Sequence, residues 1–319
     1  MTKQKKGLLE SFSGLFTSTA QLQRIVILSG IVLVLLAGSF SAYYYYDRYY
    51  QPQESKIEIQ VSAAEKAVQD DPGSVDKRIT LAESYLAVKR VEDALAIANP
   101  LILDAPDNQR LWLVLGVANV YNNTPQDGIP FLEKYLALFE NDEMAAFNKT
   151  FLSASYFLGD SYLMTGQPDK AILVLERSYS MSGSDADTMY KLGVAYTQAK
   201  KYENAKAILH QATLFVPDFE EVYKQLVIVF TETNEPALAD YASGMVAYCQ
   251  QDYEKALELL LKSEAAKKDS APTYNGLGMV YEAILDLPKA KDSYEKALAI
   301  DPNYLSASNG LERVNLTLK

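Results

Sequence analysis

The chain has 319 residues, 49% of them hydrophobic, and its 41 acidic residues against 30 basic ones give a formal net charge of −11. This excess of carboxylates argues against nucleic-acid binding, because it would repel phosphates. With one cysteine, Cys249, and one histidine, His210, the chain cannot form an intrachain disulfide or a zinc site, and it offers almost no choice of base for a catalytic triad. We expect Cys249 to be a buried small hydrophobic residue and His210 to be a packed or exposed residue of a helix, and neither to be a ligand.

The amino-terminal segment predicts a membrane anchor. Residues 25–42 carry no charge, and with the tyrosines at 43–46 the apolar run is about 22 residues, enough to cross a bilayer core. The tyrosines at its end suit the headgroup layer. We therefore predict a tail at 1–23, a transmembrane helix at 24–46 and a linker at 47–53.

The flanking charges predict the orientation of this anchor. Lys3, Lys5, Lys6 and Arg24 precede the apolar run, against Glu10 alone. The positive-inside rule then places the tail in the cytoplasm and the rest of the chain on the extracytoplasmic side of an inner or cell membrane. A cleaved signal peptide is the alternative, with small residues at 37–39, but the apolar run exceeds a typical signal core.

Beyond the linker, a residue pattern recurs every 34 positions. A fixed period of this length indicates stacked copies of one supersecondary unit. The pattern is clearest in three copies: Leu158-Gly159, Tyr162 and Ala171; then Leu192-Gly193, Tyr196, Ala205, Ala212 and Pro217; and last Leu277-Gly278, Tyr281, Ala290, Ala297 and Pro302.

Each copy reads as two helices with a short polar break between them. In the last copy the apolar spacing is helical over 274–284 and again over 288–300. Pro288 suits the first turn of a helix, and Pro302 prevents the second helix from continuing. Gly278 and Ala290 are small enough to let two helices approach closely.

These residues resemble the tetratricopeptide repeat family, whose helix–turn–helix unit carries Trp, Leu-Gly, Tyr, Ala, Phe, Ala and Pro at set offsets. The resemblance implies an all-α solenoid of helical hairpins, with about seven repeats over 54–304. Residues 305–319 read as a helix that caps the last repeat, since solenoid ends need a cover for their exposed core.

The regular pattern slips near 235–253. Ala239 fits the second helix of the fifth copy, yet Gly244 fits the first helix of the sixth, so both copies claim one helix from Pro236 to about Cys249. Either the array breaks here into two stacks, or one helix serves both copies.

The sequence contains no recognisable catalytic, nucleotide-binding or metal-binding motif. It lacks the glycine-rich loops of nucleotide sites and any metal-binding cluster, so we expect no catalytic residue, no cofactor, no metal and no small-molecule substrate.

The family resemblance implies instead that proteins or peptides bind in a groove lined by the first helix of each repeat. The second, fifth and ninth positions of those helices give the expected groove residues: Arg110, Leu113, Val117, Tyr156, Asp160, Tyr190, Val194, Tyr241 and Met245, with Ser153, Asp187 and Leu238. The clamp with which some relatives hold a chaperone tail is not expected, because Ile79 and Glu83 stand at two of its positions.

The predicted function is a non-enzymatic, membrane-anchored scaffold that recruits protein segments during secretion, envelope or complex assembly. One alternative is a permanent structural subunit of a large membrane complex. Another reverses the orientation and exposes the repeats to the cytosol.

Overall fold

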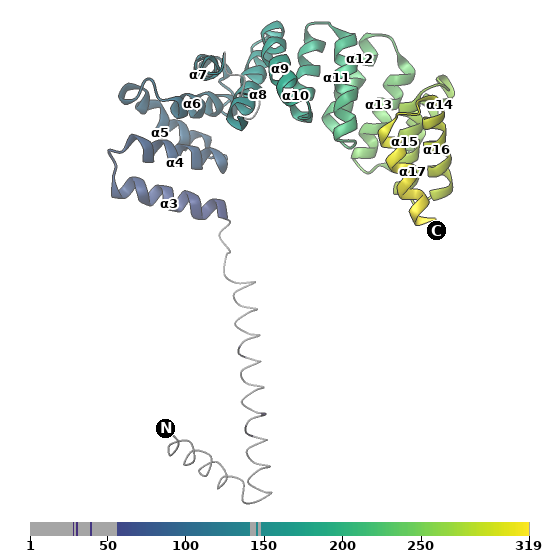
Figure 1. Ribbon diagram of the computed structural model, residues 1–319, viewed down its shortest axis with the longest axis horizontal. Coiled ribbons are helices and arrows are strands. Elements are labelled where there is room, and N and C mark those ends of the chain that lie inside the picture. Colours follow the sequence, from purple (N-terminus) through teal and green to yellow (C-terminus); the bar gives the residue numbers. More distant parts are fainter. Residues whose placement is uncertain are drawn as a thin grey trace, which may run out of the picture. The chain divides into compact units, whose positions relative to one another are not determined.

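The computed structural model describes residues 28, 30, 39, 56–140, 145 and 148–318 of the chain (Figure 1). It divides into two compact units, Met1–Ser62 and Ala63–Lys319. The tail, transmembrane helix and linker predicted at 1–53 lie outside the described residues, apart from Leu28, Gly30 and Ser39, which are helical. Among the described helices, none is both long enough and apolar enough to cross a bilayer.

The prediction of an all-α fold is confirmed for the described residues. They form fifteen helices, the first of which begins in the first unit and ends in the second: α3 (Lys56–Asp70), α4 (Val75–Ala87), α5 (Val91–Asp104), α6 (Gln109–Tyr121), α7 (Pro125–Ala137), α8 (Lys149–Met164), α9 (Pro168–Ser182), α10 (Ala186–Gln198), α11 (Tyr202–Phe215), α12 (Glu220–Glu232), α13 (Pro236–Cys249), α14 (Tyr253–Ala266), α15 (Ala271–Ala283), α16 (Leu287–Ile300) and α17 (Leu305–Thr317).

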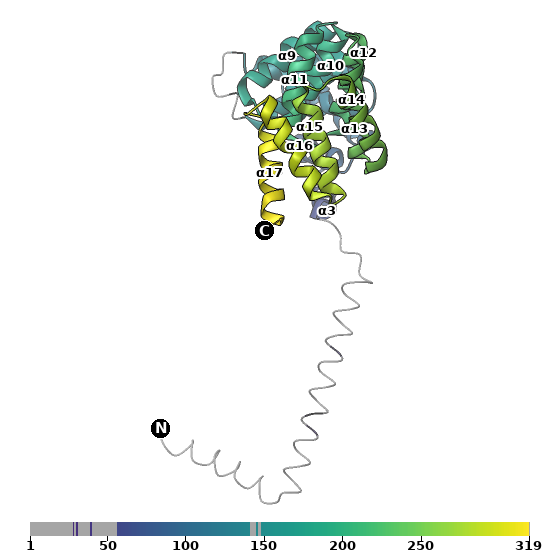
Figure 2. The same cartoon turned by 90° about the vertical axis from the view of Figure 1, so that its right-hand side faces the viewer.

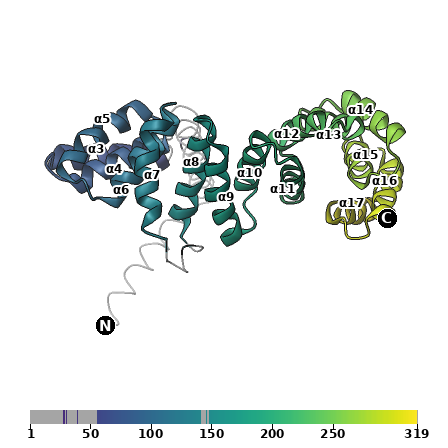
Figure 3. The same ribbon diagram turned by 90° about the horizontal axis from the view of Figure 1, so that it is seen from above.

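Within the second unit these helices follow one another as packed antiparallel pairs (Figures 1 and 3). The pairs are α4 with α5, α6 with α7, α8 with α9, α10 with α11, and α15 with α16. First helices also pack on the first helices of adjacent pairs, as α6 packs on α8 and α8 on α10. A face built from first helices therefore runs along the array.

Most of the first helices begin with a side chain that caps the helix N-terminus. The side chain before each accepts a hydrogen bond from a backbone N–H two or three residues on, which satisfies one of the free donors of the first turn. These caps are Ser74, Asn108, Asn148, Asp185 and Ser270. Several second helices begin instead with proline in the first turn, where its missing N–H costs no hydrogen bond.

A residue in the left-handed conformation separates the two helices of each pair, and its position recurs with the repeat. It is Lys89, Asn123, Gly166, Lys200, Asn234, Gln251 and Leu285 in turn, with φ between 55° and 69°. Successive members are 34 residues apart, with two exceptions. An insertion lengthens the step to Gly166, and the step from Asn234 to Gln251 is only 17 residues. A step of half a repeat means that two hairpin turns flank a single helix.

That helix is α13, which belongs to two pairs at once. It packs against α12 as a second helix does, and against α14 and α15 as a first helix does. One helix therefore serves both copies, and the array of helices is not interrupted at this point.

A glycine in the first helix and a large residue sixteen positions later let the two helices of a hairpin approach closely. The glycine of the Leu-Gly motif in the first helix faces a large side chain of the second. A Cβ on Gly159 would lie 2.6 Å from Leu175 Cγ, and one on Gly116 would lie 2.5 Å from Leu132 Cγ. Leu132 and Leu175 are fully buried. The motif is thus a steric requirement of helix pairing.

At the carboxyl end, α17 packs on α15 and α16 and covers the last pair (Figure 2). Tyr294 of α16 is fully buried, and both Gly278 of α15 and Gly310 of α17 lie against its ring. Its hydroxyl donates a hydrogen bond to Glu282 Oε2 at 2.7 Å, and Arg313 of α17 donates two hydrogen bonds to the same carboxylate at 2.9 and 3.0 Å. The small residue in α17 lets this helix reach the tyrosine that fills the last pair.

Candidate functional site: an aromatic row on the first helices

Five aromatic side chains form a row across neighbouring first helices. We call Tyr121, Phe157, Tyr156, Tyr190 and Phe219 the aromatic row; they lie in α6, α8 and α10 and directly before α12. Ring centroids are 5.4 Å apart for Tyr121 and Phe157, 5.4 Å for Phe157 and Tyr156, and 5.6 Å for Tyr190 and Phe219. Tyr121 is 49% exposed and the other four are partly buried. The row therefore offers ring surface to solvent from rigid helices.

A lysine of the chain itself bridges the two halves of the row. The Lys191 ammonium lies 5.6 Å from the ring centroid of Tyr156 and 5.9 Å from that of Tyr190. Asp160 accepts its hydrogen bond at 2.5 Å. Both side chains of this ion pair are only about one fifth exposed, at 19% and 20%. The row thus already binds one cation between two ring faces and a carboxylate.

Carboxylates surround the phenols of the row. Burial raises the pKa of Tyr156, and the charges of Asp160 and Asp187 raise it further. Burial likewise raises the pKa of Tyr190, with contributions from Glu221 and Asp160, against an opposing one from Lys224. The pKa of Asp187 is raised by burial and by Asp185 and Glu221, while Lys191 lowers it. The local field is therefore negative although two lysines are present.

An open hollow of about 490 Å³ adjoins the end of the row. Asp185 and Asp187 line it from the start of α10, and Phe215, Val216 and Phe219 line it from the end of α11 and the loop that follows. It has the size of a small binding pocket, with apolar walls and two carboxylates at one side.

The predicted groove residues fall into two groups. Arg110, Leu113 and Val117 in α6, Tyr156 and Asp160 in α8, and Tyr190 and Val194 in α10 are exposed or partly buried. Tyr241 and Met245 in α13 are 4% and 0% exposed and belong to the core. Because α13 is also the second helix of the pair with α12, these two positions are enclosed by its neighbours, and we leave them out of the candidate surface. Leu238 at the start of the same helix is only partly buried.

Arg110 connects two first helices by ion pairing. Its guanidinium donates to Glu83 at 2.6 and 3.0 Å and to Asp76 at 2.5 Å, both in α4. Arg110 is thus held by its own neighbours, which gives it a structural role at this end of the face.

Sequence reasoning did not identify Tyr121, Phe157, Phe219 or Lys191 as parts of the surface. They stand outside the second, fifth and ninth positions of their repeats. A signal for three of them was present: Tyr121, Phe157 and Lys191 each lie four residues after a predicted groove position and so share its helix face. Phe219 precedes its helix and carries no such signal.

A second hollow, of about 340 Å³, lies among α7, α8 and α9. Phe151, Leu158, Tyr162 and Arg177 are among its lining residues, and Arg177 lies over the Phe151 ring at 5.2 Å. No group of histidine, cysteine and carboxylate side chains suited to a metal is found among the described residues.

Comparison with known proteins agrees with this repeat architecture. Residues 61–116 and 162–227 match one model of the tetratricopeptide repeat, and residues 271–304 match another. A search of curated proteins finds no significant match.

Solved structures with similar folds include YrrB, described as a TPR protein with an unusual peptide-binding site (17% identity, 62% of this chain and 97% of that chain, TM-score 0.49). PilW, described as a type IV pilus biogenesis factor, is another (15% identity, 75% and 97%, TM-score 0.46). A chain of the Cut9–Hcn1 APC/C hetero-tetramer is 16% identical over 82% of this chain, with a TM-score of 0.40, and this chain spans about half of it, 53%.

Three stretches of sequence match the family's models, and the helices of each stretch pair as the 34-residue period requires. The chain is a tetratricopeptide repeat protein.

Proposed function

We propose that this protein is a scaffold that binds segments of other proteins along the aromatic row, and that its amino-terminal segment anchors it in a membrane. The aromatic row is the observation that carries the binding proposal. Its rings stand on three successive first helices and on the residue before a fourth, and each ring keeps part of its surface in solvent, where a partner could cover it.

Tyrosine-rich surfaces are well suited to protein recognition. A tyrosine supplies a large contact area with only two rotatable side-chain bonds to order, and its hydroxyl adds a polar contact. Tyr156 and Tyr190 are further held by Lys191, so little ordering remains to be done on binding. This preorganisation favours a surface that captures short segments.

Site-specific photocrosslinking in cells tests the binding proposal. A photoreactive phenylalanine analogue replaces Tyr190, and crosslinked partners are identified by mass spectrometry. The matched control places the same analogue at Leu103 in α5, which is 85% exposed and lies on a second helix. We expect partners at position 190 that are absent at position 103. Identical crosslinks at both positions, or none at 190, would contradict the proposal.

The anchor proposal is supported by the uncharged run at 25–42 and by the basic residues that precede it. It also specifies that the repeats lie on the extracytoplasmic side. A permanent subunit of a membrane complex would share this topology, but it would co-purify at constant stoichiometry, whereas a scaffold exchanges its partners.

Thiol labelling of intact cells tests the topology. Burial and nearby carboxylates raise the pKa of Cys249 to about 12, so the native thiol is almost wholly protonated at neutral pH and reacts slowly. A cysteine at position 203, where the native Glu203 side chain is 84% exposed, supplies a reactive site. A membrane-impermeant sulfonated maleimide should label it in intact cells. Labelling only after lysis would place the repeats in the cytosol.

A further inference from the structure

We propose that Tyr304 is a latch, whose ring holds helices α13 to α17 closed against α11, and that the joint between α12 and α13 is the hinge about which these helices open. What the motion exposes to partners rests on the proposed function, but the motion itself does not. In the structure the last helices curl back toward α11 (Figure 3).

The joint between α12 and α13 is the least supported in the array. At every other joint between consecutive helices from α4 to α17, a second pair of helices also packs across the joint, as α8 packs on α10 across the joint between α9 and α10. This support comes from first helices that pack on each other. At the half-repeat step the next first helix is α13 itself, so among the described helices only the packing of α12 on α13 crosses the joint extensively.

A ring contact closes the array across this joint. Tyr304, directly before α17, has its ring centroid 5.8 Å from that of His210 in α11, and it is only 5% exposed. Asp301, directly after α16, also acts electrostatically on His210. The helices α11 and α17 do not pack extensively on each other. The closure therefore depends on side chains that reach across the joint.

The latch covers a surface that corresponds to part of the aromatic row. Asn275 and Tyr304 lie two and a half repeat periods after Tyr190 and Phe219, so the two pairs hold matching positions in their copies. Tyr190 and Phe219 are partly buried and contact each other, whereas Asn275 and Tyr304 are each only 5% exposed. The row thus has a covered counterpart at the end of the array, and opening the latch would present it to a partner.

The covered surface is not a fully satisfied core. The Oδ1 atom of Asn275 is buried without a hydrogen-bond partner among the described residues, and the Nδ2 atom donates only to the Met279 sulfur, at 3.4 Å. A buried polar atom without a partner loses its hydrogen bonds to water and destabilises the closed state. Opening would return this oxygen to water and so offset part of the lost Tyr304 contact.

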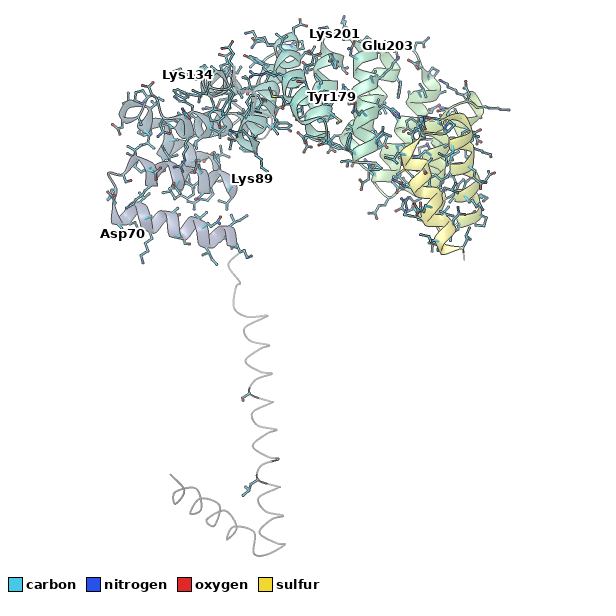
Figure 4. All side chains as sticks on the ribbon, in the orientation of Figure 1. Asp70, Lys89, Lys134, Tyr179, Lys201 and Glu203 are labelled. Carbon is cyan, nitrogen blue, oxygen red and sulfur yellow. The ribbon has the colours of Figure 1, made fainter. Side chains whose placement is uncertain are left out.

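Distances between spin labels test whether the array opens. The full-length chain in detergent, with Cys249→Ala to remove the native thiol, carries nitroxides at positions 203 in α11 and 312 in α17, where the native side chains are exposed. Figure 4 shows Glu203 beside Lys201 at the start of α11. A second labelled pair, at 169 in α9 and 203, lies on one side of the hinge and serves as the control.

Two substitutions release the latch from opposite sides. His210→Ala and Tyr304→Ala each remove one ring of the contact, and circular dichroism checks that the helices are retained. We expect each substitution to add a longer distance between positions 203 and 312 and to leave the distance between 169 and 203 unchanged. Tyr281→Ala, which removes a partly buried ring of α15 outside this contact, should change neither distance.

Hydroxyl-radical footprinting gives a second readout without labels. Oxidation of Tyr304, followed by mass spectrometry, should be about tenfold faster in His210→Ala than in the wild-type chain, because an open state populated at about a tenth or less becomes the main one. Tyr294 is fully buried at the same end of the array and should stay protected in both chains.

The outcomes separate the latch from the proposed function. An unchanged distance between 203 and 312 in both folded variants, or equal oxidation of Tyr304 in the wild-type and His210→Ala chains, would overturn the latch and make the closure a rigid cap. Neither measurement uses a partner. Failure of photocrosslinking at position 190 would contradict the proposed function and leave the latch intact.

Discussion

Tyr304, the residue before α17, has its ring 5.8 Å from the ring of His210 in α11, at an interplanar angle of 48°. In a regular solenoid each repeat contacts only its neighbours. Here the end of the array reaches a helix nearly three repeats earlier, and Tyr304 is only 5% exposed. Tyr223 and Tyr241 form a second buried ring pair, with centroids 6.3 Å apart, and Tyr241 also adjoins the Tyr304 phenol. The half-repeat step at α13 lies between these elements, so the contact joins helices on both sides of it.

This contact should set the titration of the only histidine. Burial lowers the pKa of His210, although Asp301 partly opposes the shift. The neutral imidazole is favoured in the folded chain, so His210 contributes a loss of stability as the pH falls below its ordinary pKa of about 6.5. NMR of ¹³C-labelled histidine should show one resonance that titrates below this value.

Removing Tyr304 should raise that pKa and destabilise the fold. Tyr304→Ala deletes a buried ring and should cost about 3 kcal/mol in the free energy of unfolding. The His210 resonance should then titrate closer to 6.5. Tyr281→Ala, a change of a partly buried tyrosine in α15 that does not contact His210, is the control. An unchanged histidine pKa in Tyr304→Ala would show that the ring does not exclude water there.

The glycines of the Leu-Gly motif should reject a methyl group. Gly159→Ala places a Cβ against fully buried Leu175 and should cost about 1–3 kcal/mol, measured by urea unfolding. Leu175→Ala removes a fully buried side chain and is destabilising by itself, but combined with Gly159→Ala it should cost less than the sum of the two single losses, because it also removes the clash. Gly73→Ala, where nothing lies within 4 Å of the added Cβ, should change stability little. Additive effects of the first two substitutions would argue against direct packing.

The packing of α17 on the last pair should lose stability in acid, because the Glu282 carboxylate becomes protonated. Burial alone would raise the pKa of Glu282, but the hydrogen bonds from Arg313 and Tyr294 lower it. The charged form is thus favoured in the folded chain, and its contribution is present above the ordinary glutamate pKa and lost as the pH falls through the lowered one. Glu282→Gln should destabilise the chain by about 1.5 kcal/mol at pH 7 and by less at pH 3.

Hydrogen exchange of the α17 amides measures this effect at the two pH values. Glu258→Gln is the control, since Glu258 is 65% exposed in its pair with Lys255 and should matter little at either pH. A Glu282→Gln effect of equal size at pH 3 and pH 7 would mean that packing, and not charge, accounts for it.

Leu285 should be replaceable with a gain in stability. Its φ of 63° is strained for a leucine, and its side chain is 80% exposed, so little burial is lost on its removal. Leu285→Gly should raise the free energy of unfolding by about 1 kcal/mol. Gly166 occupies the equivalent turn with a φ of 69°, and Gly166→Leu should cause a loss of similar size. A destabilised Leu285→Gly chain would indicate that the leucine has a contact that outweighs the strain.

Much of the candidate site could be predicted from the sequence because the repeat fixes which residues share a helix face. Tyr156, Asp160 and Tyr190 were found this way. Lys191 was not found, because the positional rule selects only the second, fifth and ninth residues of a repeat. It therefore omits a lysine whose ammonium lies over the rings of two selected tyrosines. Tyr241 and Met245 obey the rule but are buried, because α13 packs on α12 as well as on α14 and α15.

The sequence by itself determines the helices and their pairing: the 34-residue period, the proline at a helix start and the small residues that let two helices approach are local features, so they are visible without coordinates. The large residue opposite each of these glycines came from the structure. Only the tertiary structure decides that α13 serves two pairs and that Tyr304 reaches His210. Those contacts join residues that are distant in the chain, and they depend on how every intervening helix packs.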